Sequence, residues 1–410
     1  MTIQNECEEK KYMANTFEFI GRIALGRDTN TFHPVEQRKF NSGWTNYTVR
    51  FNCLSGTNRV LCFAQGGKWS NDANNTIKTF SKTVRNADGS VKRGEAMEVA
   101  WAKRFDAEIV DQVAGNRRFV VNTADPAVMY PLQYAIEAQE NGNADEKQQE
   151  ILAAYESLDE AKAALTKMQA KRKVFIHEWD FVEHLVKVLQ SDKFKNKLFR
   201  VSGNYDIQYN QTSGKFYTNY HVNRVVMVRD DVEQKTELRL DFYFGEDCYD
   251  ATDFEETGKA TMSGWTSYYD SNVKANGFIP VGVVYKPEKE GAVQYMATKF
   301  VAEDDEIKQV SLSIDVLDGS ERKEIRFEDL DEKTKMDIEY GVVDFETYKR
   351  QMGGNVYGDR VREWRFKEIV PDRNGNTDAK ETVYHVEDMA PARAKEDEYN
   401  YDIFDEDDDL

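Results

Sequence analysis

The chain has 410 residues, of which 40% are hydrophobic and 12% aromatic, so it can bury the cores of roughly two or three domains. It contains no run of about 18 apolar residues and begins without a basic or apolar signal region, so neither membrane insertion nor secretion is expected. The four cysteines have no metal-ligand spacing and are too few for a disulfide framework, which indicates reduced thiols and a cytoplasmic location.

The formal net charge of -19 is unevenly distributed along the chain. Residues 14–134 contain 16 Lys and Arg against 11 Asp and Glu, a balance of +5, whereas residues 195–330 contain 17 against 25, a balance of -8. Residues 395–410 contain 1 basic and 9 acidic residues, so this short tail also carries -8. The acidity therefore does not exclude phosphate binding by the N-terminal part, which is the basic one.

Short apolar runs predict three strands near the start of the chain, at residues 17–25, 44–54 and 59–64. A four-residue turn from Ser55 to Asn58 joins the last two strands as a hairpin. If this turn closes simply, one face of the hairpin carries Phe51 opposite Cys62 and Cys53 opposite Val60. The other face then carries Arg50, Asn52, Leu61 and Phe63.

The middle of the chain is expected to be a polar and helical insertion, followed by more strands. Residues 68–93 have the turn signals of long loops or a mobile hairpin. Apolar residues at helical spacing predict a helix or a helical hairpin at 145–173 and an amphipathic helix at 177–190. Further strands are expected at 198–209, 215–228, 238–244, 278–285 and 310–317, and then a helix near 330–351 and a strand at 362–370.

This order of elements predicts a mainly β, α+β protein with two five-stranded Greek-key barrels of the OB type, helical insertions and a disordered acidic tail. A β-sandwich would give similar short strands and stays an alternative. The expected parts are an N-terminal OB-like DNA-binding module at 14–134, a helical insertion at 135–194, a second OB-like module at 195–330, a helix and strand extension at 331–394, and the tail at 395–410.

Binding of single-stranded DNA without sequence preference needs flat side chains on which bases stack and cations along the phosphates. The first module has both, and a hairpin of the second module adds a tyrosine on its open face. The candidate nucleic-acid-binding residues are Arg22, Trp44, Arg50, Phe63, Lys68, Trp69, Lys78, Phe80, Lys82, Arg85 and Tyr217. Most Trp and Phe side chains are core residues, so Trp69, which lies in a Gly- and Asn-rich segment without apolar periodicity, is the strongest candidate.

The acidic tail is expected to hook partner proteins or to fold back over the basic module. Apolar side chains among so many acids serve no purpose in solubility and indicate anchors. The candidate partner-binding residues are Ile403, Phe404, Asp407, Asp408, Asp409 and Leu410. A tail that only increases solubility is the alternative.

Enzyme motifs are absent from the sequence. No glycine-rich segment has the spacing of a phosphate loop, and no histidine pair forms HExxH. Residues 372–378 resemble a calcium loop, but Val383 stands where that loop requires glutamate, so a hairpin turn is expected there. Neither catalytic residues nor metal ligands nor a cofactor are therefore predicted.

Several segments together resemble the single-stranded DNA-binding proteins of tailed bacteriophages: FEFIGRIAL, GWTNYTVRFNCL, RVLCFAQGGKW, HEWDFVEHLV and the acidic end. The resemblance implies an OB-fold protein that coats single strands during phage DNA replication, recombination and repair in the host cytoplasm. It also implies that the tail contacts replication proteins such as a polymerase, helicase or recombinase. The helical insertion, the second β module and the terminal leucine depart from the family pattern, so the resemblance leaves the oligomeric state and the tail partner undecided.

The sequence therefore predicts a non-enzymatic protein that binds single-stranded DNA. Two alternatives stay open at this point. One is a scaffold protein of a phage whose modules dock proteins only. The other is a magnesium-dependent nuclease, because carboxylate pairs are plentiful in so acidic a chain, although they are too plentiful to identify a site.

Overall fold

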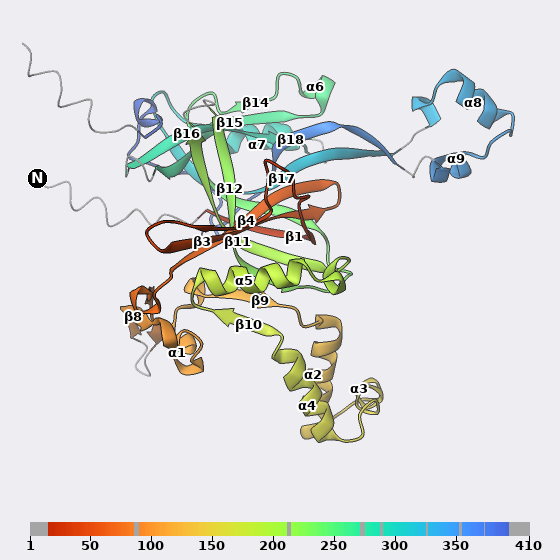
Figure 1. Cartoon of the computed structure of the whole chain (residues 1–410). Coiled ribbons are helices and arrows are strands. Elements are labelled where there is room, and N and C mark those ends of the chain that lie inside the picture. Colours follow the sequence, from red (N-terminus) through yellow and green to blue (C-terminus); the bar gives the residue numbers. More distant parts are fainter. Residues whose placement is uncertain are drawn as a thin grey trace, which may run out of the picture.

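The computed structural model describes residues 15–85, 90–210, 215–270, 275–287, 289, 291–324, 327–351, 355–372 and 374–392. Within these ranges the chain is mainly β, with helices inserted between the strands (Figure 1). This confirms the predicted α+β class. No helix in the described ranges is long and apolar enough to cross a membrane. The acidic tail at 395–410 lies outside the described residues.

Five strands of the first half of the molecule pair in a closed ring, which we call the first circuit. They are β1 (Thr16–Leu25), β3 (Trp44–Ser55), β4 (Asn58–Trp69), β11 (Leu198–Asn210) and β12 (Lys215–Met227). β1 lies antiparallel to both β3 and β11, β3 to β4, and β11 to β12. β4 and β12 close the ring in parallel, with Cys62 opposite Tyr220. A short strand, β2 (Val35–Lys39), extends the ring beyond β3.

The hairpin of β3 and β4 has the register that its turn predicts. Phe51 lies opposite Cys62 and Cys53 opposite Val60. All four side chains are buried, while Leu61 on the other face is 47% exposed. Because side chains alternate along a strand, one face of this hairpin fills the core and the other faces out.

Three cysteine thiols are free and buried in the core, as the sequence predicts: Cys53, Cys62 and Cys248. Burial raises the pKa of the Cys53 and Cys248 thiols to about 12. It also raises the pKa of Cys62 well above its usual value. We refer to them as the three buried thiols.

Helix α5 (Glu178–Leu189) packs against the first circuit, where the sequence predicts a helix at 177–190. Its apolar side, including Phe181 and Leu185, is fully buried in the main core. The chain can approach β4 this closely because residue 66 is glycine: a Cβ there would lie 2.3 Å from the backbone nitrogen of Trp179. In Figure 1, α5 lies between the strands of the circuit and β9.

The described part of the insertion between β4 and α5 contains a two-stranded ribbon, four short strands and several helices. The ribbon pairs β5 (Thr76–Phe80) with β8 (Ala96–Ala100), and β6 (Val84–Arg85) pairs with β7 (Val91–Lys92). Of the predicted loop or hairpin segment 68–93, the described part from Thr76 onwards therefore contains hairpin strands, whereas residues 68 and 69 belong to β4. Next come α1 (Ala107–Gln112), β9 (Phe119–Asn122), α2 (Pro126–Glu140), α3 (Glu146–Leu152), α4 (Leu158–Gln169) and β10 (Arg172–Phe175). Of the two alternatives for 145–173, a helix or a helical hairpin, the structure has two helices, which share a small core with α2 around Leu132, Ile136 and Ala161.

A second ring of five strands, the second circuit, has the same connectivity. Its strands are β13 (Lys235–Phe244), β15 (Ala260–Asp270), β16 (Ala275–Tyr285), β17 (Lys308–Glu324) and β18 (Asn355–Ile369). β13 pairs with β15 and β17, β15 with β16, and β17 with β18, all antiparallel. β16 and β18 close the ring in parallel. α7 (Ala292–Lys299) connects β16 to β17, as α5 precedes β11 in the first circuit.

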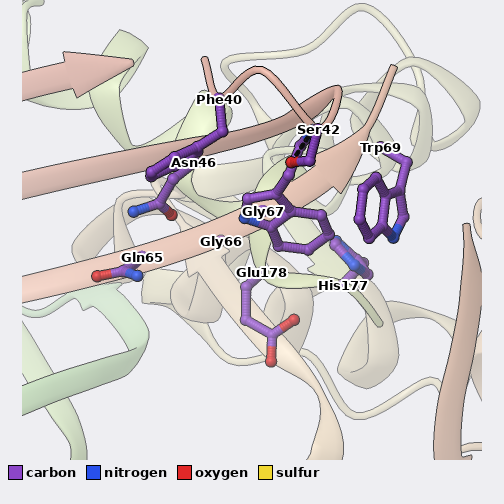
Figure 2. Close-up of a pocket in the computed structure, with 10 residues that line it drawn as sticks. Phe40, Ser42, Asn46, Gln65, Gly66, Gly67, Trp69, His177 and Glu178 are labelled. Carbon is purple, nitrogen blue, oxygen red and sulfur yellow. Dashed lines mark hydrogen bonds between the residues drawn. The ribbon is translucent and has the colours of Figure 1, made fainter. Parts of the chain in front are cut away.

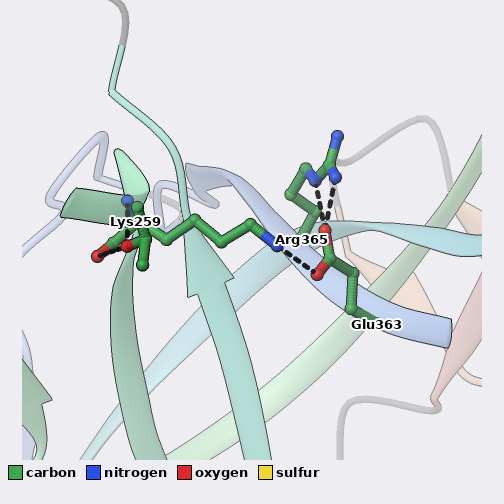
Figure 3. Close-up of polar contacts among 4 residues, drawn as sticks. Lys259, Glu363 and Arg365 are labelled. Atoms are coloured by element: carbon green, nitrogen blue, oxygen red, sulfur yellow. Dashed lines mark hydrogen bonds and ion pairs between the residues drawn. The ribbon is translucent and has the colours of Figure 1, made fainter. Parts of the chain in front are cut away.

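Smaller elements decorate the second circuit. They are β14 (Tyr249–Asp250), α6 (Phe254–Thr257), α8 (Glu332–Glu339), α9 (Phe345–Gln351) and β19 (Lys380–Glu381). The helix predicted near 330–351 is therefore two helices, and Figure 1 shows them at the far end of β17 and β18. Glu363 bonds to both Lys259 and Arg365, which ties the chain before β15 to β18 (Figure 3).

The module boundary predicted at residue 195 differs from the one in the structure. β11 and β12 complete the first circuit, and the second begins at β13. The two circuits are also joined, since β1 pairs with β13 from Thr16 opposite Arg239 onwards. The Asn58 side chain donates to Thr236 Oγ1 at 3.0 Å across the same junction. Strand patterns cannot predict such pairings, because partners so far apart in sequence are chosen by packing and not by local periodicity.

Candidate nucleic-acid interface

Two tryptophans form a pair on the outward face of β3 and β4. Trp44 and Trp69 lie opposite each other across the strands, with ring centroids 5.2 Å apart and planes at 68°. A Cβ at Gly67 would lie 2.0 Å from the Trp44 ring, so the ring rests directly on the strand backbone there. Trp69 is 36% exposed. The register that places Phe51 opposite Cys62 also places Trp44 opposite Trp69.

A cavity of about 710 Å³ lies beside the tryptophan pair (Figure 2). It is lined by Phe40, Ser42, Trp44, Asn46, Gln65, Gly66, Gly67, Trp69, His177 and Glu178. In the view of Figure 2, Trp69 and His177 lie on one side and Asn46 and Gln65 on the other. The lining therefore has aromatic rings at one side and amides with the Phe40 ring at the other, which suits a base with a π face and polar edges.

His177 has a structural role at the edge of this cavity. It is the N-cap of α5, and its Nδ1 accepts a hydrogen bond from the Trp179 backbone at 3.1 Å. Its ring meets Trp101 edge-on, with centroids 4.9 Å apart. Burial lowers the pKa of His177, so the neutral imidazole that accepts the hydrogen bond is favoured. His177 is therefore a half-buried cap at the edge of the cavity.

A second cavity, of about 420 Å³, continues the first one between β12 and the ribbon strand β5. The two cavities share Gln65, His177 and Glu178, so together they form one groove, which we call the stacking groove. Lys78 and Arg117 bring positive charge to the second cavity. Cations beside an aromatic cavity are the combination that single-strand binding requires.

His221 contributes to the wall of the stacking groove, although sequence reasoning did not select it. The parallel pairing of β4 and β12 places it opposite Phe63, with ring centroids 4.3 Å apart. Its Nε2 lies 2.8 Å from a carboxylate oxygen of Asp206 on β11. Alternation along β12 indicates that His221 is exposed on the same face as Tyr217. Only the pairing of β12 with β4 brings His221 to the groove.

Several predicted residues do line the stacking groove. Trp44 and Trp69 lie in the first cavity and Lys78 in the second. Phe80 is 45% exposed at the end of the same ribbon strand. The guanidinium of Arg117, a residue that the sequence analysis missed, lies 5.3 Å from the centre of the Phe80 ring. Stacked cation and ring form a further platform for a base.

Other predicted cations are engaged elsewhere. Arg50 donates to the backbone carbonyl of His33 at 3.3 Å, which holds the loop after β1. Lys82 pairs with Asp111 at 2.8 Å. Two further candidates are exposed on strands of the first circuit but outside the two cavities: Arg22 and Tyr217.

Lys68 is a correction to the predicted site. β4 continues to Trp69, so neighbouring residues point to opposite faces, and Lys68 Nζ lies 4.7 Å from the centre of the Trp179 ring on the α5 side. It does not share the face of Trp69. The side chain of Arg85 and the whole tail, with its candidate anchors, lie outside the described residues.

The comparisons with known proteins give little beyond this geometry. No protein-family model and no curated protein matches the chain. Among solved structures, a deletion mutant of the single-stranded DNA-binding protein from Thermus aquaticus aligns with a TM-score of 0.26 and 8% identity, covering 74% of this chain and 86% of that one. The function proposed below therefore rests on the site and not on this likeness.

Proposed function

We propose that the chain binds single-stranded DNA, without sequence preference and without catalysis, through the stacking groove. The observation that carries this proposal is the partly exposed Trp44–Trp69 pair at the head of a groove that also holds Lys78 and Arg117. Every base has a π face for the rings and every nucleotide a charge for the cations, so such a surface binds strands of any sequence.

We also propose that each circuit is an OB-type barrel. Support comes from the order in which the strands pair. In both rings the third and fifth strands pair in parallel, and every other neighbouring pair in the ring is antiparallel. In both rings a helix also precedes the fourth strand. OB folds bind oligonucleotides on the face of their second and third strands. In the first circuit these strands are β3 and β4, which carry the tryptophan pair.

The wider role in this proposal is to coat exposed strands during phage DNA replication, recombination or repair in the host cytoplasm. The tail at 395–410 would contact a polymerase, helicase or recombinase. Its support is the sequence alone, which combines 9 acidic residues with the apolar Ile403, Phe404 and Leu410.

The exposed tip of the second circuit favours a protein-docking function as a second candidate. On and after α8, Met336 is 53%, Tyr340 77% and Val342 71% exposed. Exposed apolar side chains gathered on one projecting element indicate a contact surface for a protein. This role is compatible with DNA binding at the stacking groove.

The test is fluorescence anisotropy of a labelled oligo-dT titrated with the full-length chain and with a truncation that ends at Arg393, at low and moderate salt. We expect tight binding that weakens steeply with salt, because each phosphate contact adds about 0.7 to the slope of log affinity against log salt for single strands. Stronger binding after truncation would mean that the tail competes with DNA. If neither the full-length nor the truncated chain binds, the protein-docking function replaces the proposal.

A further inference from the structure

We propose that a bound single strand leaves the stacking groove and continues over β11 and β12 into a second groove, where arginines bind its phosphates and a tyrosine pair stacks its bases. This inference rests on the proposed function and extends its binding site. The second groove consists of two cavities, of about 490 and 560 Å³, that share Asn122, Met129, Tyr130, Arg200 and Val226. We call it the arginine groove.

The two grooves meet on one surface of the sheet. Asn204 lines the stacking groove and Ser202, two residues earlier on β11, lines the arginine groove. On β12, Asn223 lines the stacking groove and the next residue, Arg224, lines the arginine groove. A strand that follows the outward face of β11 and β12 therefore passes from one groove into the other without crossing the core.

A β-bulge makes this continuous surface possible. Ser202 pairs with Arg224 but Gly203 pairs with Val222, so Asn223 is an extra residue on β12. The extra residue shifts the alternation, and Arg224 faces outwards with His221, three positions before it, while Val222 and Val225 are buried. A Cβ at Gly203 would lie 1.9 Å from the His221 carbonyl oxygen, so only glycine fits opposite the bulge.

Arginines from three strands converge in the first cavity of this groove: Arg172 on β10, Arg200 on β11 and Arg224 on β12. Arg172 and Arg224 are exposed and make no ion pair within the described ranges. Glu18 is the only acid among the described residues that line this cavity. Arg200 forms an ion pair with Glu18, its Nε lying 3.5 Å from the Glu18 Oε2, although this buried Nε makes no hydrogen bond. Arg172 and Arg224 can therefore both bind phosphate oxygens of a strand through charge-assisted hydrogen bonds.

A pair of tyrosines lines the second cavity. Tyr130 and Tyr134 lie one helical turn apart on α2, with ring centroids 6.5 Å apart and planes at only 24°. They are 47% and 58% exposed. Arg229 lies in the same cavity. Two parallel, open rings beside a cation repeat the chemistry of the stacking groove at the other end of the path.

The experiment compares a short oligo-dT of about 6 nucleotides, which one OB-type face can hold, with a long one of about 25 nucleotides. The full-length chain carries either the double substitution Arg172→Gln and Arg224→Gln or the single substitution Tyr130→Ala. We expect each variant to bind the long strand at least about fivefold more weakly and the short strand as the wild type does. For the long strand, the double variant should also lower the slope of log affinity against log salt by about 1.4, because it removes two phosphate contacts of about 0.7 each.

Two further variants make the outcomes distinguishable. Arg362→Gln removes an exposed arginine on β18 that lines neither groove, and should leave both affinities unchanged. Trp69→Ala should weaken binding of both lengths. Unchanged binding and salt slope of the long strand in the groove variants, with Trp69→Ala weakened, would overturn the extended path and leave the proposed function intact. If the wild type binds neither length, the proposed function fails and this inference falls with it.

Discussion

Replacing Trp69 by alanine tests the candidate interface at its centre. The ring is 36% exposed and meets Trp44 edge-on at 5.2 Å. Loss of one base stack, worth about 1–3 kcal/mol, should weaken oligo-dT binding about 5- to 150-fold. The structural cost comprises the aromatic pair, about 0.5–1.5 kcal/mol, and the apolar area of the buried part of the ring, so stability has to be measured beside affinity. The backbone bonds between residue 69 and the Asn75 side chain, at 2.8 and 3.0 Å, do not depend on the ring.

The assay is anisotropy of a labelled oligo-dT at fixed salt, with thermal unfolding of the same samples. The melting temperature should fall by about 2–4 °C for each kcal/mol of stability lost, the range for a folding unit of about 150–250 residues. Tyr340→Ala, which removes a 77% exposed ring from the tip beyond α8, is the matched control and should change neither quantity. A Trp69→Ala variant that binds as tightly as the wild type would remove Trp69 from the site and refute the reasoning about the groove.

Three further predictions concern the fold. Gly66→Ala should destabilise the chain by about 1–3 kcal/mol in urea unfolding, because its Cβ would meet the Trp179 backbone at 2.3 Å; an unchanged midpoint would mean that α5 does not pack as described. Although burial opposes it, hydrogen bonds from Lys367 and a second lysine lower the pKa of Glu237 to about 2 from its usual 4.5. Stability from this carboxylate is therefore present above pH 4.5 and lost as the pH falls towards 2, and urea midpoints should depend less on pH over this range in Glu237→Gln. The three buried thiols should resist alkylation at pH 8 until urea unfolds the chain, as mass spectrometry can show.

Elements with local signals can be predicted from the amino-acid pattern alone. The period of two in residues 44–64 and one four-residue turn determined the hairpin register and which face is buried. The apolar side of α5 follows equally from helical spacing, with Phe181 and Leu185 in the core. The exposure of Trp69 followed from its polar, glycine-rich context. Lys68 was misplaced because β4 was expected to end at residue 64, so alternation was not applied to residues 65–69.

The closing strands of each circuit and the neighbours of the tryptophan pair depend on packing between distant parts of the chain. β11 and β12 join β1 and β4 across more than a hundred residues of insertion, and this pairing places His221 against Phe63. The bulge opposite Gly203 then turns Arg224 towards the arginine groove. Local patterns report which residues are buried, but the partner of a buried face is chosen by packing over the whole chain. For that reason the sequence predicted the kind of surface, and the fold alone decided which residues share it.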